Sequence, residues 1–334
     1  MKKYIFFRTD RIGDFLVSLI LIQSIKRNDP KAHITVIASN KNYSYIKSLN
    51  SIDETILYPN GILKRFIFIV KMLNKNFNAV FALDGKKRSI YSSILIKSRF
   101  KFLLTTKILY KKLLNLFFYN IIYEKEYKNK LEEIKSLLSS LKYNFKNSDL
   151  NVFESERTVK KIPYNLNEEP ILFHFDEKWI FNEYIQKYSK IEPGEDELRN
   201  FIKEIILKTN KNLFITTGLK SNKLIESFKK NFTLLEDNTY FLNINNKKVI
   251  LFVNKDFNQI QEMILVSKII ICCHGAVSHV AAGFNKKIID IYDQSEEQFY
   301  NRWTSHFRNY NFLYRENFSK LSEKILYKLI LNNS

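Results

Sequence analysis

Short apolar runs rich in β-branched and aromatic residues alternate with longer amphipathic stretches along most of this 334-residue chain. Each run has the length of a strand, and each stretch between two runs has the spacing of a helix that buries one face. Such alternation is typical of α/β proteins, because parallel strands need a crossover connection that is usually a helix. The pattern therefore predicts an α/β fold built on parallel sheets.

The expected strands fall into two groups. The first group includes residues 3–7, 33–38 and 78–83, and the second includes residues 171–175, 212–216, 249–253, 269–273 and 288–292. Between Asn147 and Pro170 the apolar periodicity fades, which is typical of a domain boundary. We expect one domain over residues 1–160 and another over residues 161–334, with the last helix, residues 319–331, packing back on the first domain.

The segment from Arg99 to about Lys146 is basic and aromatic, and its pattern predicts helix. Its apolar residues between Leu113 and Ile121 are flanked by Lys111, Lys112 and Lys125. This segment is either an ordinary helix that faces the core or a face that rests on anionic lipid. In the second case, residues 99–125 would contact an anionic membrane peripherally.

The charge balance narrows the choice of partners. Lys and Arg number 54 against 34 Asp and Glu, which gives a net charge of +20. This excess favours phosphorylated substrates, an acidic membrane face or nucleic acid, although the abundance of Lys, Asn and Ile is also what AT-rich coding DNA produces. Because no helix-turn-helix, zinc-finger or RNA-recognition signature accompanies the charge, we expect no nucleic-acid partner.

The cysteines and the first residues bear on the compartment. Cys272 and Cys273 are neighbours, which rarely satisfy disulfide geometry, and they end an apolar run, so we expect two buried thiols and no metal site. The first three residues imitate a signal peptide, but the charges between Arg8 and Asp14 interrupt its apolar part. No nearby apolar stretch approaches the roughly 20 residues that span a bilayer. We expect a cytoplasmic protein.

One constellation of polar residues, Arg8 to Asp14, lies between the first strand and the first helix. Gly13 would permit a tight turn, and the N–H groups of the helix start could face an anion. Asp14 would then lie at the helix N-terminus. From the residues alone, the alternative is that Asp14 is only an N-cap and that Arg8 and Asp10 form a surface pair.

Other polar residues follow strands of the second group. Lys178 comes after residues 171–175, Gly218 after the next strand, and residues 274–282 directly after the run that ends at Cys273. Ligands of open α/β sheets bind outside the carboxyl ends of the strands, and the loop at His274 could hold a pyrophosphate on its N–H groups. A solvated lysine, a simple turn glycine and a structural loop are the alternatives.

These motifs, in this order, resemble glycosyltransferase family 9, the ADP-heptose:lipopolysaccharide heptosyltransferases and their relatives. The matching segments are residues 8–14, 29–36, 52–59, 77–89, 178–179 and 269–303. The resemblance spans nearly the whole chain and is weakest between about residues 95 and 170. It implies a GT-B architecture, in which two Rossmann-like domains with parallel sheets face each other across a cleft. The acceptor would bind the first domain and the nucleotide sugar the second.

The resemblance also implies roles for single residues in an inverting, metal-independent transfer. Asp14 would be the general base that takes the proton of the acceptor hydroxyl, and Lys178 would offer positive charge to the leaving diphosphate. The implied donor-binding residues are Gly218, His274, Gly275, Ala276, Ser278 and His279. The implied acceptor-binding residues are Arg8, Arg11, Gly13, Asp84 and Arg88.

The donor loop departs from the family's pattern, which is Asp, then Thr or Ser, then Gly, with a histidine three positions later. Here His274, Gly275 and Ala276 stand at those positions, and residues 293–295 replace a Gly-Pro-Thr-like turn. The implied function is transfer of a heptose or related sugar from a nucleoside diphosphate, expected to be ADP, to a lipopolysaccharide-type or other anionic glycan or glycolipid. No further cofactor is implied. The alternative is an inactive protein of this fold that binds a sugar nucleotide or a glycan, and the expected location is the cytoplasm or the inner face of the cytoplasmic membrane.

Overall fold

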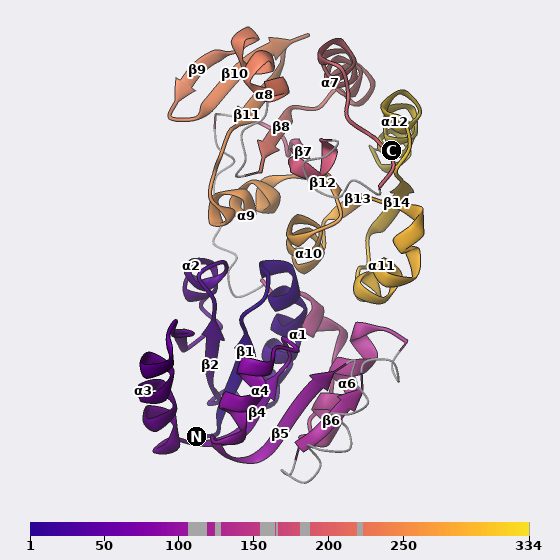
Figure 1. Cartoon of the computed structure of the whole chain (residues 1–334). Helices are drawn as coiled ribbons and strands as arrows, with labels where there is room; N and C mark the ends of the chain where they lie inside the picture. Colours follow the sequence, from indigo (N-terminus) through magenta and orange to yellow (C-terminus); the bar gives the residue numbers. More distant parts are fainter. Residues whose placement is uncertain are drawn as a thin grey trace. The chain divides into compact units, whose positions relative to one another are not determined.

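The computed structural model describes residues 1–105, 119–123, 128–153, 164, 166–180, 188–218 and 223–333. The chain divides into two compact units. The N-terminal unit comprises Met1–Glu156 and Arg302–His306, and the C-terminal unit comprises Arg157–Asn301 and Phe307–Ser334. Each unit is built on its own sheet (Figure 1). Within the described ranges, no helix is both long and apolar enough to cross a membrane.

The sheet of the N-terminal unit has six parallel strands in the order β3-β2-β1-β4-β5-β6. The strands are β1 (Lys3–Arg8), β2 (His33–Ala38), β3 (Glu54–Leu57), β4 (Asn76–Ala82), β5 (Lys97–Thr105) and β6 (Tyr119–Tyr123). This is the strand order of the dinucleotide-binding Rossmann fold. The order reverses between β1 and β4, so the loops that follow these two strands lie at the point where such sheets bind ligands.

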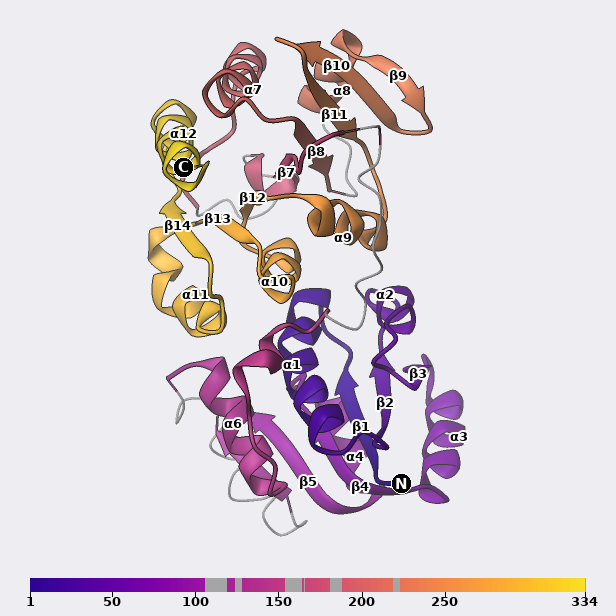
Figure 2. The same cartoon turned by 180° about the vertical axis from the view of Figure 1, so that it is seen from behind.

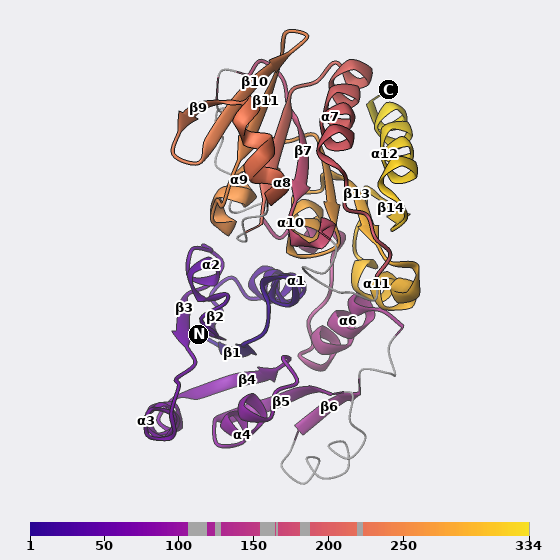
Figure 3. The ribbon, with the colours of Figure 1, turned by 45° about the horizontal axis from the view of Figure 1, so that its top comes forward.

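Helices cover both faces of this sheet. They are α1 (Ile12–Asn28), α2 (Tyr43–Lys47), α3 (Ile62–Leu73), α4 (Lys87–Ile94) and α6 (Lys130–Ser140). Figure 3 shows α1 and α6 on one side of the sheet and α3 and α4 on the other. The long helix α1 is buried through most of its length, from Phe15 to Ile25, and packs beside α6 on the same side of the sheet.

The expectation of one helical segment from Arg99 to Lys146 is wrong in its first part. Residues 97–105 form the strand β5, and its ring of Phe102 stacks on Phe81 of β4 at 5.0 Å. Residues 119–123 form the next strand, whereas helix is confirmed at α6. The remainder of the basic aromatic segment, residues 106–118 and 124–127, lies outside the described residues.

The sheet of the C-terminal unit has eight strands in the order β14-β13-β12-β7-β8-β11-β10-β9, with β10 antiparallel to both of its neighbours. The strands are β7 (Ile171–Phe175), β8 (Leu213–Thr217), β9 (Thr233–Glu236), β10 (Thr239–Ile244), β11 (Lys247–Phe252), β12 (Ile269–Cys273), β13 (Lys287–Tyr292) and β14 (Tyr310–Tyr314). The order reverses between β7 and β12. The loops after these strands, which contain Lys178 and His274, are therefore neighbours.

The helices of this unit are α7 (Glu195–Thr209), α8 (Lys223–Phe228), α9 (Phe257–Val266), α10 (Ala276–Gly283), the first part of α11 (Glu297–Thr304) and α12 (Phe318–Asn333). The last residues of α11, from Arg302 on, are assigned to the N-terminal unit. The last helix lies beside α7 (Figures 1 and 2). Its Phe318, Leu321 and Ile325 are buried in the core that surrounds Trp179. This helix belongs to the C-terminal unit, and the expectation that it packs back on the first domain stays a prediction.

Candidate functional site

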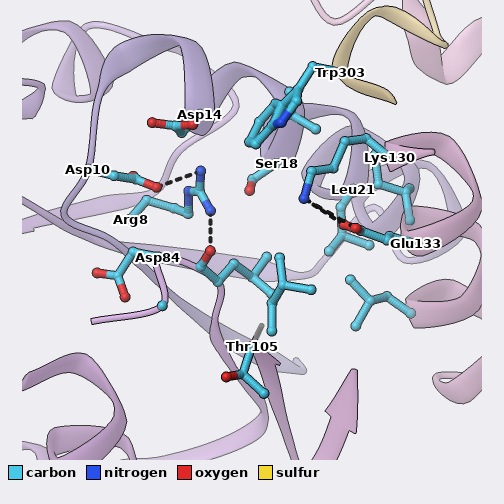
Figure 4. A pocket seen from close by; sticks show the side chains of 16 residues that line it. Arg8, Asp10, Asp14, Ser18, Leu21, Asp84, Thr105, Lys130, Glu133 and Trp303 are labelled. Carbon is cyan, nitrogen blue, oxygen red and sulfur yellow. Dashed lines mark hydrogen bonds and ion pairs between the residues drawn. The ribbon is translucent and has the colours of Figure 1, made fainter. Parts of the chain in front are cut away.

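Arg8 lies at the switch point of the N-terminal sheet, at the end of β1. Its guanidinium is 4% exposed, donates from Nη1 to the Leu83 carbonyl at 2.7 Å and pairs through Nη2 with Asp10 at 2.8 Å (Figure 4). The Arg8–Asp10 pair thus exists, but it is not the surface pair that one interpretation of the sequence expected. A cation this deeply buried needs its carboxylate partner, so Asp10 is fixed beside the loop that follows β4.

Asp84 holds the two switch-point loops together. Its carboxylate accepts hydrogen bonds from the Thr9 hydroxyl at 2.6 Å and from the Ser89 hydroxyl at 2.6 Å. Arg88 donates to the same Thr9 hydroxyl at 3.0 Å. Asp84 therefore positions the loops after β1 and β4, and direct contact of Asp84 with an acceptor stays a prediction.

Asp14 lies in the first turn of α1 and is only partly buried. Its Oδ2 accepts a hydrogen bond from the Arg11 N–H at 3.3 Å, and among the described residues no ion pair engages its carboxylate. Two cavities share Asp14 in their walls. Gly13 lies inside the helix, so the expectation of a tight turn at this glycine is wrong. The Asp14 carboxylate remains accessible to a ligand in either cavity.

The first cavity, of about 290 Å³, has charged side chains on two opposite sides (Figure 4). One charged side is formed by Arg8, Asp10 and Asp14, and the other by Lys130 and Glu133. The apolar part is lined by Val17, Leu21, Leu83, Leu104, Ile134 and Leu137. Lys130 lies 4.4 Å from the ring centroid of Trp303 and pairs with Glu133 at 2.9 Å, while Arg302 pairs with the same carboxylate. The cavity suits a ligand that has polar groups on two sides of a less polar body.

The second cavity, a basin of about 930 Å³, is basic. Its charged residues are Arg11, Lys41, Lys86, Lys87 and Arg88 against the carboxylates Asp10 and Asp14. Burial lowers the pKa of Lys86, whose Nζ donates to the Thr9 carbonyl. Arg88 also stacks over the Tyr58 ring, 5.1 Å from its centroid. Five cations against two carboxylates favour an anionic ligand in this basin.

The surroundings of Asp10 raise the pKa of its carboxyl group. Burial raises the pKa of Asp10, the Arg8 charge opposes the rise, and the charges of Asp14 and Asp84 add to it, so that the net pKa is about 6. One buried oxygen of Asp10 has no hydrogen-bond partner among the described residues. Asp10 therefore holds its proton more tightly in the folded chain than in the unfolded chain, where its pKa has the ordinary value of 3.8.

This tighter proton binding predicts how stability depends on pH. Asp10 stabilises the fold fully below about pH 4, and this contribution is lost as pH rises through about 6. The wild type should lose up to about 3 kcal/mol relative to Asp10→Asn over that window, at 1.36 kcal/mol for each pH unit. Urea unfolding at pH 4.5 and pH 7.5 should show about 2 kcal/mol of this difference, because about 1 kcal/mol is already lost at pH 4.5.

Asp53 provides a control of opposite sign. Although burial raises the pKa of Asp53, the hydrogen bonds from Lys26 and from the Ile34 N–H lower it more, so the net shift is downward. Its stabilising contribution is present at neutral pH and is lost as pH falls. If the free energy of unfolding changes equally with pH in the wild type and in Asp10→Asn, Asp10 is not the group that causes the pH dependence.

In the C-terminal unit, Lys178 lies in the 3₁₀ turn Glu177–Trp179 that follows β7. Its Nζ pairs with Asp176 at 2.6 Å, and His174 Nε2 lies 3.5 Å from the same carboxylate oxygen. Burial by itself raises the pKa of Asp176, but the Lys178 charge and the His174 hydrogen bond outweigh it, so the pKa lies well below its usual range. The Lys178 ammonium is thus held at the switch point with 17% of its side chain exposed.

Two glycines let the loops approach Lys178 and its neighbours closely. A Cβ at Gly275 would lie 2.7 Å from Lys178 Nζ, and a Cβ at Gly218 would collide with the Glu177 carboxylate. Gly275 precedes α10 and Gly218 follows β8. The structure therefore brings the predicted residues Lys178, Gly218 and Gly275 together at one edge of the sheet.

His274 is held by a carboxylate from the neighbouring strand β13. Its Nδ1 donates to Asp290 at 2.6 Å, and the ring stacks at a tilt against Tyr300 with centroids 4.4 Å apart. Ser278 donates to the other Asp290 oxygen at 2.8 Å, and His279 meets the His274 ring edge-on. The arrangement leaves Nε2 as the ring nitrogen of His274 that can meet a ligand, whereas the Ser278 hydroxyl is committed to Asp290.

Sequence reasoning missed two residues of this site, Asp290 and Arg315. Arg315 follows β14, donates to the Lys178 carbonyl at 2.9 Å and lines the same small pocket as His274 and Tyr300. A sequence signal existed for Asp290, because it is the one charged residue inside an apolar strand, residues 288–292, and is fully buried. Arg315 carried no comparable signal.

The two cysteines are confirmed as buried free thiols, and burial raises the pKa of both. Among the residues that the structure describes, no group of three or more His, Cys, Asp or Glu side chains could hold a metal ion.

Comparison by sequence finds no relative, since no family model and no curated protein matches the chain. Comparison by structure finds several. The heptosyltransferase WaaC of E. coli with ADP is 13% identical, with a TM-score of 0.66 over 99% of this chain and 100% of that chain. ADP-heptose lps heptosyltransferase II of E. coli is also 13% identical, with a TM-score of 0.66 over 100% and 98%.

Two further solved structures are similar to this chain. A family 9 glycosyl transferase of Veillonella parvula is 12% identical, with a TM-score of 0.62 over 94% of this chain and 87% of that chain. A Listeria monocytogenes protein described as a UDP-N-acetylglucosamine 2-epimerase is 10% identical, with a TM-score of 0.56 over 100% and 90%. One architecture thus accommodates different reactions, and the chemistry must be argued from the site. The chain has the two-domain GT-B fold of the family 9 glycosyltransferases.

Proposed function

We propose that this chain is an inverting, metal-independent glycosyltransferase that moves a heptose or related sugar from a nucleoside diphosphate to an anionic glycan or glycolipid. The observation that carries the proposal is the Asp14 carboxylate, which is accessible, free of ion pairs among the described residues and shared by the walls of two cavities. Inverting transfer needs a carboxylate that takes a proton from the attacking hydroxyl.

The C-terminal unit would bind the donor. Lys178 and Arg315 provide positive charge for the leaving diphosphate, and the oriented His274 ring can contact the phosphates or the sugar. Among the structural neighbours, E. coli WaaC was solved with ADP and with ADP-2-deoxy-2-fluoro heptose, which supports ADP as the first nucleotide to test.

The N-terminal unit would bind the acceptor. Its basic basin favours phosphate or carboxylate groups, and the enclosed cavity beside Asp14 accepts a less polar part of the same molecule. In the reaction, the Asp14 carboxylate accepts the proton of the acceptor hydroxyl, whose oxygen bonds to the anomeric carbon as the bond to the diphosphate breaks. Arg8 keeps Asp10 in place beside it.

The test is release of nucleoside diphosphate from ADP-, GDP-, UDP- and dTDP-sugars, with glycan and glycolipid acceptors, by the wild type and Asp14→Ala. Acceptor-dependent release that requires Asp14 supports the proposal. Saturable binding of a sugar nucleotide without turnover would favour the inactive binding protein instead. Interconversion of the sugar on its nucleotide would favour an isomerase.

A further inference from the structure

Helix α3 presents an apolar face to solvent, opposite the face that it buries. Its exposed apolar side chains include Ile62 at 86%, Leu63 at 72% and Phe66 at 63% exposure, and Ile67, Val70 and Leu73 continue the same face. These positions are spaced by three to four residues or are direct neighbours, so they form one stripe along the helix. Soluble proteins rarely expose a contiguous apolar stripe of this kind without a use for it.

The stripe is not needed to hold the helix in place. Phe68 and Met72 point the other way and are buried with Tyr58, Phe77 and Val80 under the sheet. Helix α3 is therefore anchored by one narrow face, and the apolar residues on its outer face contribute nothing to the core of the unit.

Charge distinguishes between the surfaces that could cover this stripe. No acidic residue occurs between Ile62 and Lys75, whereas Lys64 and Lys71 are exposed and lie next to the stripe on the helix. The remaining basic residues of the segment are engaged, Arg65 with Tyr58 and Lys75 with Glu54. An apolar face bordered by lysines is the pattern of a helix that lies in the interface of an anionic bilayer.

The basic basin begins where the helix begins. Tyr58 and Asn60 line the basin, and Ile62, two residues further on, is the most exposed apolar residue of α3. Helix α4 lies on the same side of the sheet (Figure 3) and exposes Tyr91, and Leu95, directly after its end, is also exposed. A bilayer that receives α3 would thus present its anionic head groups beside the cations of the basin, which a second copy with the same net charge of +20 would not do.

We propose that α3 docks this protein on an anionic lipid surface, with Ile62, Leu63, Phe66 and Ile67 inserted among the acyl chains and Lys64 and Lys71 at the head groups. This assigns membrane contact to α3, whereas the sequence pointed to residues 99–125, of which the described parts form the strands β5 and β6. The inference does not depend on the proposed catalytic activity.

Co-sedimentation of the full chain with vesicles tests the inference. We expect binding to phosphatidylcholine vesicles that contain 30% phosphatidylglycerol, weak binding to pure phosphatidylcholine, and weaker binding as salt is raised. Phe66→Ser with Ile67→Ser should lower the partition coefficient at least tenfold, and Lys64→Glu with Lys71→Glu should do the same. The matched control is Leu234→Ser with Leu235→Ser, which removes two exposed apolar residues of β9 and should change nothing.

A second measurement identifies the occupant of the stripe. The emission of Phe66→Trp should shift to the blue on anionic vesicles, while that of Leu234→Trp should not. Equal binding of the wild type to neutral and anionic vesicles would overturn the electrostatic part, and a dimer in sedimentation velocity that Phe66→Ser abolishes would make a second copy the occupant. Binding of ADP should be unchanged in the α3 variants, so failure of the docking proposal and failure of the proposed function remain distinguishable.

Discussion

Asp14→Asn is expected to lower turnover by about 10²- to 10⁴-fold, the range that a general base typically contributes. Asparagine has the shape of aspartate and can still accept the hydrogen bond from the Arg11 N–H, so the first turn of α1 should persist. Because the amide cannot take a proton at neutral pH, the loss should appear in kcat, with KM for the sugar nucleotide nearly unchanged. Initial rates of nucleoside diphosphate release measure both constants.

Asp29 and Asp10 provide matched comparisons for this variant. Asp29 caps the other end of α1 and lines neither cavity, so Asp29→Asn should keep wild-type turnover. Asp10→Asn keeps Asp14 but removes the charge beside it, and should lower turnover less than Asp14→Asn does. A turnover of Asp14→Asn within tenfold of the wild type, with a larger loss in Asp10→Asn, would move the base to Asp10.

The strands that position the site could be predicted because they are buried on both faces. Residues 3–7, 33–38, 171–175 and 269–273 are mostly apolar runs, and each forms a parallel strand within one residue of the expected bounds. Buried parallel strands need apolar side chains on both faces, so their sequences are unambiguous. The polar residues that follow them, Arg8 to Asp14 and the loop at His274, accordingly lie at the carboxyl edges of the sheets.

The strand β5 could not be predicted in this way. Its first residues, Lys97 to Lys101, are exposed or half-buried, and basic side chains alternate there with others. The apolar part, Phe102 to Leu104, is too short to distinguish a strand from a helix. Pairing with β4 decides the conformation, and that pairing joins residues about 20 positions apart. The pattern of neighbouring residues therefore does not predict this pairing.

The hydrogen-bond partners of the site residues also could not be predicted from the pattern of neighbouring residues. Asp290 reaches His274 because β12 and β13 are neighbours in register, with Cys272 opposite Asp290. Arg315 reaches the Lys178 carbonyl only through the strand order of the whole sheet. Sequence reasoning could name His274 as a departure from the family, but not the buried carboxylate that orients its ring.

We expect His274 and Asp290 to depend on each other in binding the sugar-nucleotide donor. In Asp290→Asn the Nδ1–H of His274 loses its bond to a charged acceptor, and an amide nitrogen can turn toward the ring, so Nε2 is no longer directed at the pocket. The loss of a hydrogen bond to a charged group costs about 1.5–3 kcal/mol, which predicts a fall in kcat/KM for the sugar nucleotide of roughly 10- to 150-fold. His274→Gln should fall by a similar factor.

A double-mutant cycle separates this coupling from two independent defects. If Asp290 acts only by orienting His274, the double variant should be no worse than the poorer single variant, since the second change removes nothing more. Tyr310→Phe removes a 3.1 Å hydrogen bond to Asp290 without touching His274, and it should have a small effect. Calorimetric titration with ADP should show weaker binding in both single variants and unchanged binding in Asp14→Asn. Additive losses with unchanged affinity for ADP would place the pair outside the donor site.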